Sequence, residues 1–237
     1  MPTPPELIVK PPEELAFIFA DRLAGLALRA RLEGRPVGVA LPGGSVAEVF
    51  FPVLAQAKID WDLIEWFWGD ERAVSPAHPD SNFRVAQDLF FSRTSINPAR
   101  IHRMPADAND LDAGASAYEE DLMTTLGVPP RLDIALLGMG PDGHVCSLFP
   151  GHPALDEPSR FAMAVTDSPK PPPRRLTLTL PALADAVVVL AAFGASKAAA
   201  IQEVMENAKS TLPAARALRG ARHGMVMVDR SVVSIQS

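Results

Sequence analysis

The feature that most constrains the fold is a nearly unbroken apolar run, LDIALLGM (Leu132–Met139). A strand that is apolar on both faces is typical of a parallel sheet covered by helices on both sides, because a half-solvated strand would alternate polar and apolar residues. Similar short runs recur along the chain, and segments of helical apolar spacing lie between several of them. The sequence therefore predicts an α/β protein with a layered, mostly parallel sheet.

The expected elements follow one another as strand, loop and helix. The expected strands are Val37–Leu41, Ile64–Gly69, Leu132–Met139, Arg175–Leu180, Ala186–Phe193 and Gly224–Val228, and the expected helices are Glu13–Leu32, Val46–Gln56, Phe83–Phe91, Asp110–Leu126 and Ser196–Asn207. The polar stretch DERAVSPAHPDSN is expected to be a loop. The proline-rich stretch Ser168–Arg175 is also interpreted as a surface loop rather than a linker, because apolar strands continue on both sides of it. We therefore expect one domain, residues 1–237.

Composition excludes several classes of function. The chain has 237 residues, 48% hydrophobic and 21% charged, which is typical of a globular protein with a sizeable core. A net charge of -6 argues against nucleic acid or an anionic membrane as a partner, since both attract clustered Lys and Arg. Cys146 is the single cysteine and the first residues do not resemble a signal peptide, so we expect a cytoplasmic monomer or small homo-oligomer.

Loops that directly follow strands are the candidates for a site, because ligands of open parallel sheets bind at the carboxyl ends of the strands. Four such loops stand out: PGGS, GDER, GMGPDGHVCS and GASK. In the first, Gly43 and Gly44 let the backbone approach an anion, and Ser45 can cap the next helix and donate its hydroxyl. For this motif taken alone, a plain turn with a capping serine is the better explanation, and a phosphate site is the alternative.

The loop after Leu132–Met139 satisfies the G-x-G-x-x-G pattern of dinucleotide sites, but Pro150, Gly151 and Pro153 follow where that fingerprint needs a helix. We therefore expect no nicotinamide cofactor. His144 in this loop is a candidate general base, with a loop-stabilising histidine as the alternative.

Ligand-type side chains gather in this same loop and just beyond it. They are Asp142, His144, Cys146 and His152, and they match no zinc spacing, so neither a metal nor an organic cofactor is expected. Cys146 is interpreted as a small, partly buried residue rather than a nucleophile.

Other charged residues lie shortly after an expected strand or at the start of one. Asp70 and Arg72 follow the second expected strand, where they can steer an anion or hold an imidazole, although a solvated turn has the same composition. Lys197 lies in the first turn of an expected helix, where the helix dipole disfavours a cation. A cation placed there suggests an anionic ligand nearby, and Arg175 is a further candidate of this kind.

These motifs together carry a family resemblance over nearly the whole chain. LLGMGPDGHVCSLFPGHPAL resembles the signature of the 6-phosphogluconolactonases, and WGDERAVSPAHPDSNFRVA, PPPRRLTLTLPAL and FGASKAAAI match further blocks of that family in order. The SLFPG continuation separates the lactonases from the related glucosamine-6-phosphate deaminases and isomerases. Pro42 and Cys146 depart from the family pattern, which usually has serine and alanine there.

The resemblance implies a fold and a reaction. The fold is a modified doubly wound, mostly parallel sheet flanked by helices, and the reaction is hydrolysis of 6-phospho-D-glucono-1,5-lactone in the pentose phosphate pathway. His144, Asp70 and Arg72 match the residues of the reaction centre, with His144 as the acid-base group. The residues matching the phosphate site are Gly43, Gly44, Ser45, Arg175 and Lys197.

Two other functions remain open. One is a sugar-phosphate isomerase or deaminase on the same fold, which would use the Asp70 carboxylate to move a substrate proton. The other is a non-catalytic sugar-phosphate sensor, although the chain has neither spare length nor a basic segment for a DNA-binding helix pair.

Overall fold

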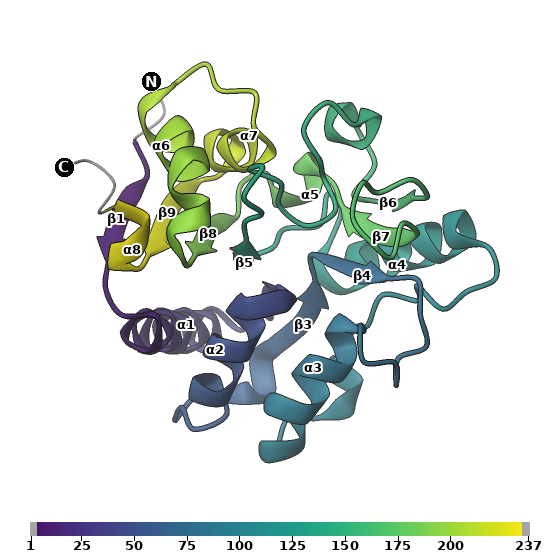
Figure 1. Ribbon diagram of the computed structural model, residues 1–237. Coiled ribbons are helices and arrows are strands. Elements are labelled where there is room, and N and C mark those ends of the chain that lie inside the picture. The colour runs from purple at the N-terminus through teal and green to yellow at the C-terminus, as the bar shows by residue number, and fades with distance from the viewer. Residues whose placement is uncertain (1–3, 234–237) are drawn as a thin grey trace.

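A six-stranded parallel sheet forms the centre of the protein (Figure 1). The computed structural model describes residues 4–233, and the strand order is β1-β9-β8-β5-β2-β3 with every neighbouring pair parallel. The strands are β1 (Glu6–Val9), β2 (Val37–Leu41), β3 (Ile64–Trp68), β5 (Ile134–Gly138), β8 (Val187–Ala192) and β9 (His223–Val228). The predicted parallel sheet is confirmed, and its edge strand β1 is the one member that the sequence patterns did not indicate.

A second, smaller sheet is antiparallel and was not predicted. It consists of β4 (Asp70–Arg72), β7 (Arg175–Leu178) and β6 (Ala162–Val165) in the order β4-β7-β6. Two expectations were therefore wrong: residues 70–72 form a strand rather than a loop, and residues 175–178 pair with them instead of joining the parallel sheet. The pairing is non-local, so no pattern inside either segment could indicate it.

Helices cover the sheets. They are α1 (Pro12–Glu33), α2 (Gly44–Leu54), α3 (Asn82–Leu89), α4 (Leu111–Leu126), α5 (Leu180–Leu183), α6 (Ala198–Glu206), α7 (Pro213–Gly220) and α8 (Arg230–Val233). Helix α1 packs on α2, and α4 packs on β6 and β7 at the side of the small sheet. The five predicted helices are confirmed. Helices α5 and α8 have four residues each, too few for sequence periodicity to show, and α7 was not predicted.

Residues at the ends of two helices account for their bounds. Pro12 opens α1, where its missing N–H costs nothing, and Gly34 ends it in the left-handed conformation at φ 67°. Asp110 caps α4 by accepting hydrogen bonds from the backbone N–H groups of Asp112 and Ala113.

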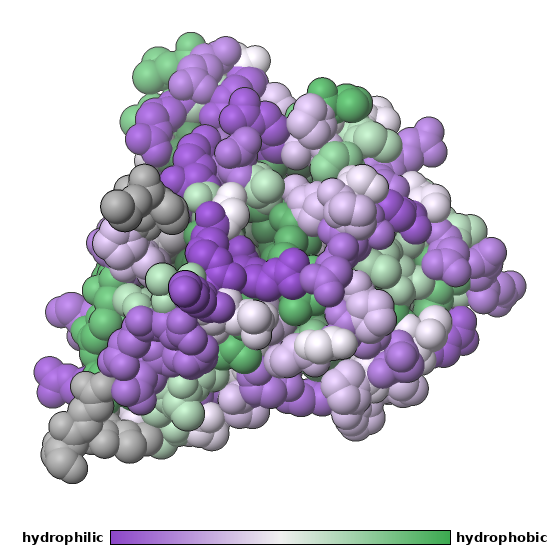
Figure 2. All heavy atoms as spheres, turned by 90° about the horizontal axis from the view of Figure 1, so that it is seen from above, coloured by the Kyte–Doolittle hydropathy of each residue, from purple (hydrophilic) through white to green (hydrophobic). Residues whose placement is uncertain are grey.

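The core lies between the parallel sheet and its helices. Strands β2 and β3 are buried along their whole length, and the side chains of Phe19, Phe50 and Trp66 are fully buried with them. Figure 2 shows hydrophilic residues over most of the projecting surface of one face, with hydrophobic residues in a hollow near its centre. Among residues 4–233 there is no helix with the length and apolarity that a membrane crossing needs.

Gly69 joins the two sheets at one residue. Its N–H donates to the carbonyl of Leu41 at the end of β2, and its carbonyl accepts from the N–H of Leu178 on β7. The buried hydroxyl of Tyr118 accepts from the N–H of Trp68 (2.8 Å) and donates to the Trp68 carbonyl (3.2 Å). The chain thus leaves β3 without an unpaired backbone group, and Asp70 and Arg72 start the small sheet at the carboxyl end of the large one.

A histidine between two carboxylates ties the loop after the 3-10 helix η3 (Pro98–Arg100) to the sheet. His102 Nδ1 lies 2.9 Å from Asp121 Oδ2, its Nε2 lies 3.1 Å from Glu65 Oε2, and its ring stacks on Phe67. Burial lowers the pKa of His102, but hydrogen bonds and charge from Asp121 and Glu65 raise it more, to about 9. His102 is therefore a structural cation at neutral pH.

This cluster predicts a pH dependence of stability. The pKa of His102 is higher in the folded state than the unperturbed value of about 6.5, so its stabilisation is complete below about pH 6.5 and is lost as pH rises through 9. We expect His102→Gln to lower the free energy of unfolding at pH 6.5. At pH 10 the free energies of unfolding of the variant and the wild type should lie closer together. Urea unfolding at several pH values measures this, with the exposed His78→Gln as control. A difference that stays constant with pH would contradict the prediction.

Candidate active site

A single cavity of about 260 Å³ collects the predicted site residues. It opens at the carboxyl ends of β2, β3, β5 and β8, so the four loops selected from the sequence meet there. The predicted residues that line it are Gly43, Gly44, Ser45, Asp70, Arg72, His144, Arg175 and Lys197. The cavity wall also contains Asn82, Cys146 and Lys170. The structure thus brings together every predicted site residue, while their individual roles stay predictions.

The start of helix α2 forms one wall of the cavity. Gly43 is the residue that precedes the helix, Gly44 is left-handed at φ 62°, and Ser45 is already inside the first turn. The expectation that Ser45 caps α2 was therefore wrong, because no side chain caps this helix. Among residues 4–233 the first N–H groups of α2 have no side-chain acceptor, which is the arrangement that receives an anion at a helix start.

Asn82 packs against Gly43 and was missed by the sequence analysis. A Cβ built on Gly43 would lie 1.9 Å from Asn82 Oδ1, so glycine is required there by close approach rather than by its backbone angles. Asn82 is buried, and its Nδ2 donates to the carbonyl oxygen of Asp70 (2.8 Å). Its Oδ1 is buried with no hydrogen-bond partner among the described residues. Asn82 therefore fixes the distance between the start of α2 and the start of β4.

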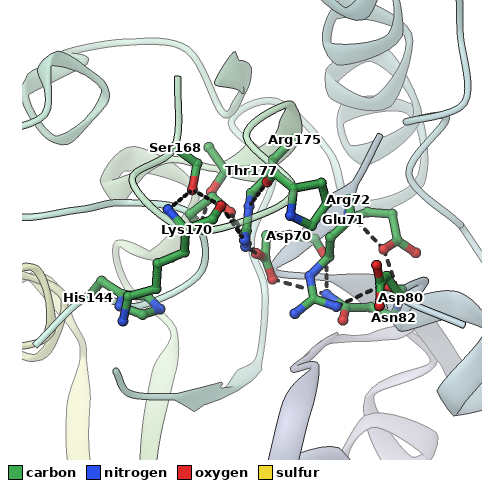
Figure 3. Close-up of polar contacts among 12 residues, drawn as sticks. Asp70, Glu71, Arg72, Asp80, Asn82, His144, Ser168, Lys170, Arg175 and Thr177 are labelled. Atoms are coloured by element: carbon green, nitrogen blue, oxygen red, sulfur yellow. Dashed lines mark hydrogen bonds and ion pairs between the residues drawn. The ribbon is translucent and has the colours of Figure 1, made fainter. Parts of the chain in front are cut away.

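Asp70 is a buried carboxylate with partners on three sides (Figure 3). Its Oδ2 accepts from the buried hydroxyl of Ser147 (2.7 Å) and lies 3.6 Å from Arg175 Nη1, while its Oδ1 accepts from Asn82 Nδ2 (3.2 Å). A buried carboxylate is tolerated when it is both paired and hydrogen-bonded, and each condition is met here. Both oxygens of Asp70 are thus engaged inside the protein.

Arg175 turns its guanidinium toward the protein rather than toward the open cavity. Its Nε donates to the carbonyl of Pro172 (3.0 Å), and its Nη2 donates to the carbonyls of Lys170 and Pro171 (3.1 Å each). Its Nη1 faces Ser147 and Asp70. The side chain is almost fully buried, and this burial lowers the pKa of Arg175. Its position in the cavity wall agrees with the prediction, but its contacts hold the proline-rich loop.

Two other cations have donors left for a ligand. Arg72 Nη1 donates to the carbonyl of Asp80 (2.6 Å), whereas its Nε is buried without a partner among the described residues. Lys197 lies at the start of α6, and its ammonium group has no hydrogen bond or ion pair within residues 4–233. Burial lowers the pKa of Lys197, and the nearby charge of Lys170 lowers it further. Unpaired, partly desolvated cations around one cavity favour an anionic ligand.

His144 is held by a carboxylate two residues earlier in the same loop. Its Nδ1 lies 2.6 Å from Asp142 Oδ1, and its ring packs on Phe149 with 4.6 Å between ring centroids. Because a carboxylate accepts hydrogen bonds, Nδ1 of the neutral imidazole carries the proton and Nε2 carries the lone pair. Burial lowers the pKa of His144, against the opposing effect of Asp142. At neutral pH the ring is therefore a neutral base.

Gly140 leaves the space that this pair needs. A Cβ at Gly140 would lie 2.0 Å from His144 Nδ1 and 2.4 Å from Asp142 Oδ1. The loop after β5 is closed by a hydrogen bond from the N–H of Gly140 to the carbonyl of His144 and does not open a helix. The glycines of the G-x-G-x-x-G pattern thus serve a compact loop, in agreement with the rejection of a dinucleotide site.

The remaining ligand-type residues lie apart from a common centre. Cys146 is packed against Gly69, and burial raises the pKa of its thiol well above the usual range. His152 Nε2 pairs with Asp167 (2.9 Å) outside the cavity. In residues 4–233 no three His, Cys, Asp or Glu side chains are placed to hold a metal ion.

Four residues of the site were not predicted from the sequence to have the roles that they have in the structure. Asn82 and Ser147 are ordinary polar residues whose importance comes from contacts with Asp70, and Asp142 was considered only as a metal ligand. Lys170 lies in the stretch interpreted as a surface loop, and the run of prolines around it was the one available hint of a rigid backbone.

Comparison with known proteins identifies relatives along nearly the whole chain. The family model for glucosamine-6-phosphate isomerases/6-phosphogluconolactonase matches residues 10–227. The chain is 35% identical to a 6-phosphogluconolactonase of Streptomyces coelicolor, with 97% of this chain and 94% of the relative covered. It is 39% identical to one from Mycobacterium tuberculosis, with 89% and 88% covered.

Solved structures show the same fold. The 6-phosphogluconolactonase from Trypanosoma cruzi superimposes with a TM-score of 0.88 at 25% identity, and 100% of this chain and 98% of the other are covered. A monomeric glucosamine-6-phosphate deaminase superimposes with a TM-score of 0.80 at 24% identity over 98% and 100% of the two chains. The fold is thus shared by lactonases and deaminases.

Because Gly43 lies against Asn82, adding one methyl group at position 43 should destabilise the folded protein. We expect Gly43→Ala to lower the free energy of unfolding by about 1–3 kcal/mol, because the new Cβ collides with a buried amide held by Asp70. In the double variant Gly43→Ala with Asn82→Ala, part of that loss should be recovered.

Gly25→Ala is the matched control for this prediction. Gly25 lies inside α1 with open space around its Cβ position, so alanine there should stabilise the helix by up to about 1 kcal/mol. Thermal and urea unfolding measure all variants. Equal stability of Gly43→Ala and wild type would contradict the close contact.

Proposed function

Because this chain belongs to the glucosamine-6-phosphate isomerase/6-phosphogluconolactonase family, we propose that it hydrolyses 6-phospho-D-glucono-1,5-lactone to 6-phospho-D-gluconate. The observation that carries this proposal is the Asp142–His144 pair, which presents a neutral imidazole to a cavity surrounded by cations. The relatives named 6-phosphogluconolactonase, at 35–39% identity over most of the chain, support the same reaction. The protein is proposed to act as one domain in the cytoplasm.

His144 supplies both proton transfers of the reaction. Nε2 takes a proton from water, and the resulting hydroxide attacks the lactone carbonyl carbon. The imidazolium, stabilised by Asp142, then gives its proton to the ring oxygen as the bond to the carbonyl carbon breaks. The product forms as a carboxylic acid with a free hydroxyl, and His144 returns to its neutral form. The acid then loses its proton to solvent at neutral pH and becomes the carboxylate.

Cations and backbone N–H groups supply the electrostatic part. Arg72 lies in the cavity wall and is proposed to stabilise the oxyanion that forms on the carbonyl oxygen. The start of α2 at Gly43–Ser45 and the unpaired Lys197 are proposed to hold the phosphate. Arg175 lies in the wall beside them and holds the loop that carries Lys170.

The contacts of Asp70 favour hydrolysis over isomerisation. An isomerase or deaminase on this fold needs a carboxylate free to accept a substrate proton, whereas both oxygens of Asp70 are engaged by Ser147, Arg175 and Asn82. We therefore propose that Asp70 positions the site rather than moving a proton. Product analysis separates the two reactions, since hydrolysis yields gluconate 6-phosphate and isomerisation yields a ketose phosphate.

His144→Gln should remove the acid-base chemistry while leaving binding intact. We expect turnover, corrected for spontaneous hydrolysis of the lactone, to fall by about a hundredfold to ten-thousandfold. In the wild type, activity should fall with decreasing pH only below about 6.5, since burial lowers the pKa of His144 and the base must be neutral. His223→Gln, at an exposed histidine far from the cavity, is the control.

The same measurement can overturn the assignment. A folded His144→Gln protein that hydrolyses the lactone within a few-fold of wild type would remove His144 as the base. Loss of affinity for gluconate 6-phosphate by the same factor as the loss of turnover would mean that His144 acts in binding instead.

Lys197→Ala should separate phosphorylated from unphosphorylated substrate. Loss of one charge-assisted contact costs about 1.5–3 kcal/mol, so kcat/KM for 6-phosphogluconolactone should fall by roughly ten- to hundredfold. The rate with unphosphorylated gluconolactone should change little. Lys209→Ala, at an exposed lysine after α6, should leave both rates unchanged. An equal loss with both substrates would place Lys197 outside the phosphate site.

A further inference from the structure

Lys170 lies at the edge of the cavity on a loop whose backbone is fixed from inside the protein. The hydroxyl of Ser168 accepts from the Lys170 N–H (3.2 Å) and donates to the Lys170 carbonyl (3.0 Å). Arg175 donates to that same carbonyl, and the N–H of Ser168 donates to the carbonyl of Pro173. Both Ser168 and Arg175 are buried, with 7% and 5% of their surface exposed. A solvated surface lysine needs no such support.

The side chain of Lys170 points toward His144 (Figure 3). Its Nζ lies 3.5 Å from Asp142 Oδ1, and His144 Nδ1 lies 2.6 Å from that same oxygen. One carboxylate oxygen therefore serves the ammonium group and the imidazole together. Two of the three groups come from the loop after β5, and the third comes from the proline-rich loop before β7.

We propose that Lys170 is a positioning residue for the hydrolysis, which acts on His144 through the Asp142 oxygen that the two side chains share. The inference rests on the proposed function, because it assumes that His144 is the base. The ammonium group takes up part of the Asp142 charge and keeps the imidazole ring in its neutral form. It also orients the carboxylate, so that Nδ1 stays the protonated nitrogen and Nε2 stays the base.

The charges around His144 show why such a group is needed. Asp142 and Asp70 favour the imidazolium, whereas Lys170 and burial favour the neutral ring. Lys197, Arg72 and Arg175 lie in the same cavity wall, and their charges also oppose a second cation. A bound phosphate dianion would offset those three cations and raise the pKa of His144. The ammonium group of Lys170 opposes this rise in the pKa of His144, and its position is set by the loop rather than by the substrate.

The test follows the imidazole itself rather than the reaction. We expect the His144 ring, observed by NMR in the full-length protein, to become protonated at higher pH in Lys170→Gln than in wild type. Lys170→Arg keeps the charge and should titrate close to wild type. Arg174→Gln removes a neighbouring exposed cation of the same loop and should leave the titration unchanged. The same titrations with inorganic phosphate added should show a larger difference between Lys170→Gln and wild type.

Kinetics provide a second readout. In Lys170→Gln the ratio of kcat/KM at pH 5.5 to that at pH 8 should fall by about two- to fivefold relative to wild type, and Lys170→Arg should restore it. A folded Lys170→Gln protein whose imidazole titrates as in wild type overturns the inference. A different result is a higher His144 pKa in Lys170→Gln than in wild type, together with no lactonase activity in the wild type. It would contradict the proposed function and still establish the coupling of Lys170 to His144.

Discussion

The buried carboxylate of Asp70 is the interaction on which the rest of the site depends. It receives hydrogen bonds from Ser147 in the loop after β5 and from Asn82 at the start of α3, and it pairs with Arg175 on β7. Removal of one partner from a buried ion pair typically costs 3–5 kcal/mol, because the remaining charge is then uncompensated. Three segments that are distant in sequence are thus held at one point, and Arg175 extends this connection to the backbone of the proline-rich loop.

The electrostatics of the cavity differ from those of the whole protein. The chain carries a net charge of -6, yet the cavity wall contains Arg72, Lys170, Arg175 and Lys197. These cations differ in their contacts. The guanidinium of Arg175 makes hydrogen bonds inside the protein, and the ammonium group of Lys170 contacts the carboxylate that also holds His144. The ammonium group of Lys197 has no ion pair in the described part of the chain. This division separates a structural cation from cations available to a ligand, which a count of basic residues could not do.

The same scaffold is found in lactonases and in a deaminase, so the fold alone does not determine the reaction. The chemistry depends on which acid-base group is free at the carboxyl ends of the strands. In this protein the imidazole of His144 has a free lone pair, whereas the carboxylate of Asp70 is fully engaged. The short connection at Gly69 places both groups next to the same cavity, because it starts the small sheet where the large sheet ends.

The sequence by itself determined five strands of the parallel sheet, five of the helices and the loops of the site, since apolar periodicity and glycine-rich strand ends are local signals. All eight residues that the sequence analysis assigned to the site line the cavity. Only the tertiary structure showed the antiparallel pairing of β4 with β7, the close contact of Asn82 with Gly43, and the inward direction of Arg175. It likewise brought Lys170 to Asp142 across 28 residues of sequence. Such contacts join segments that are far apart along the chain, and no periodicity within a segment records what it will meet after folding.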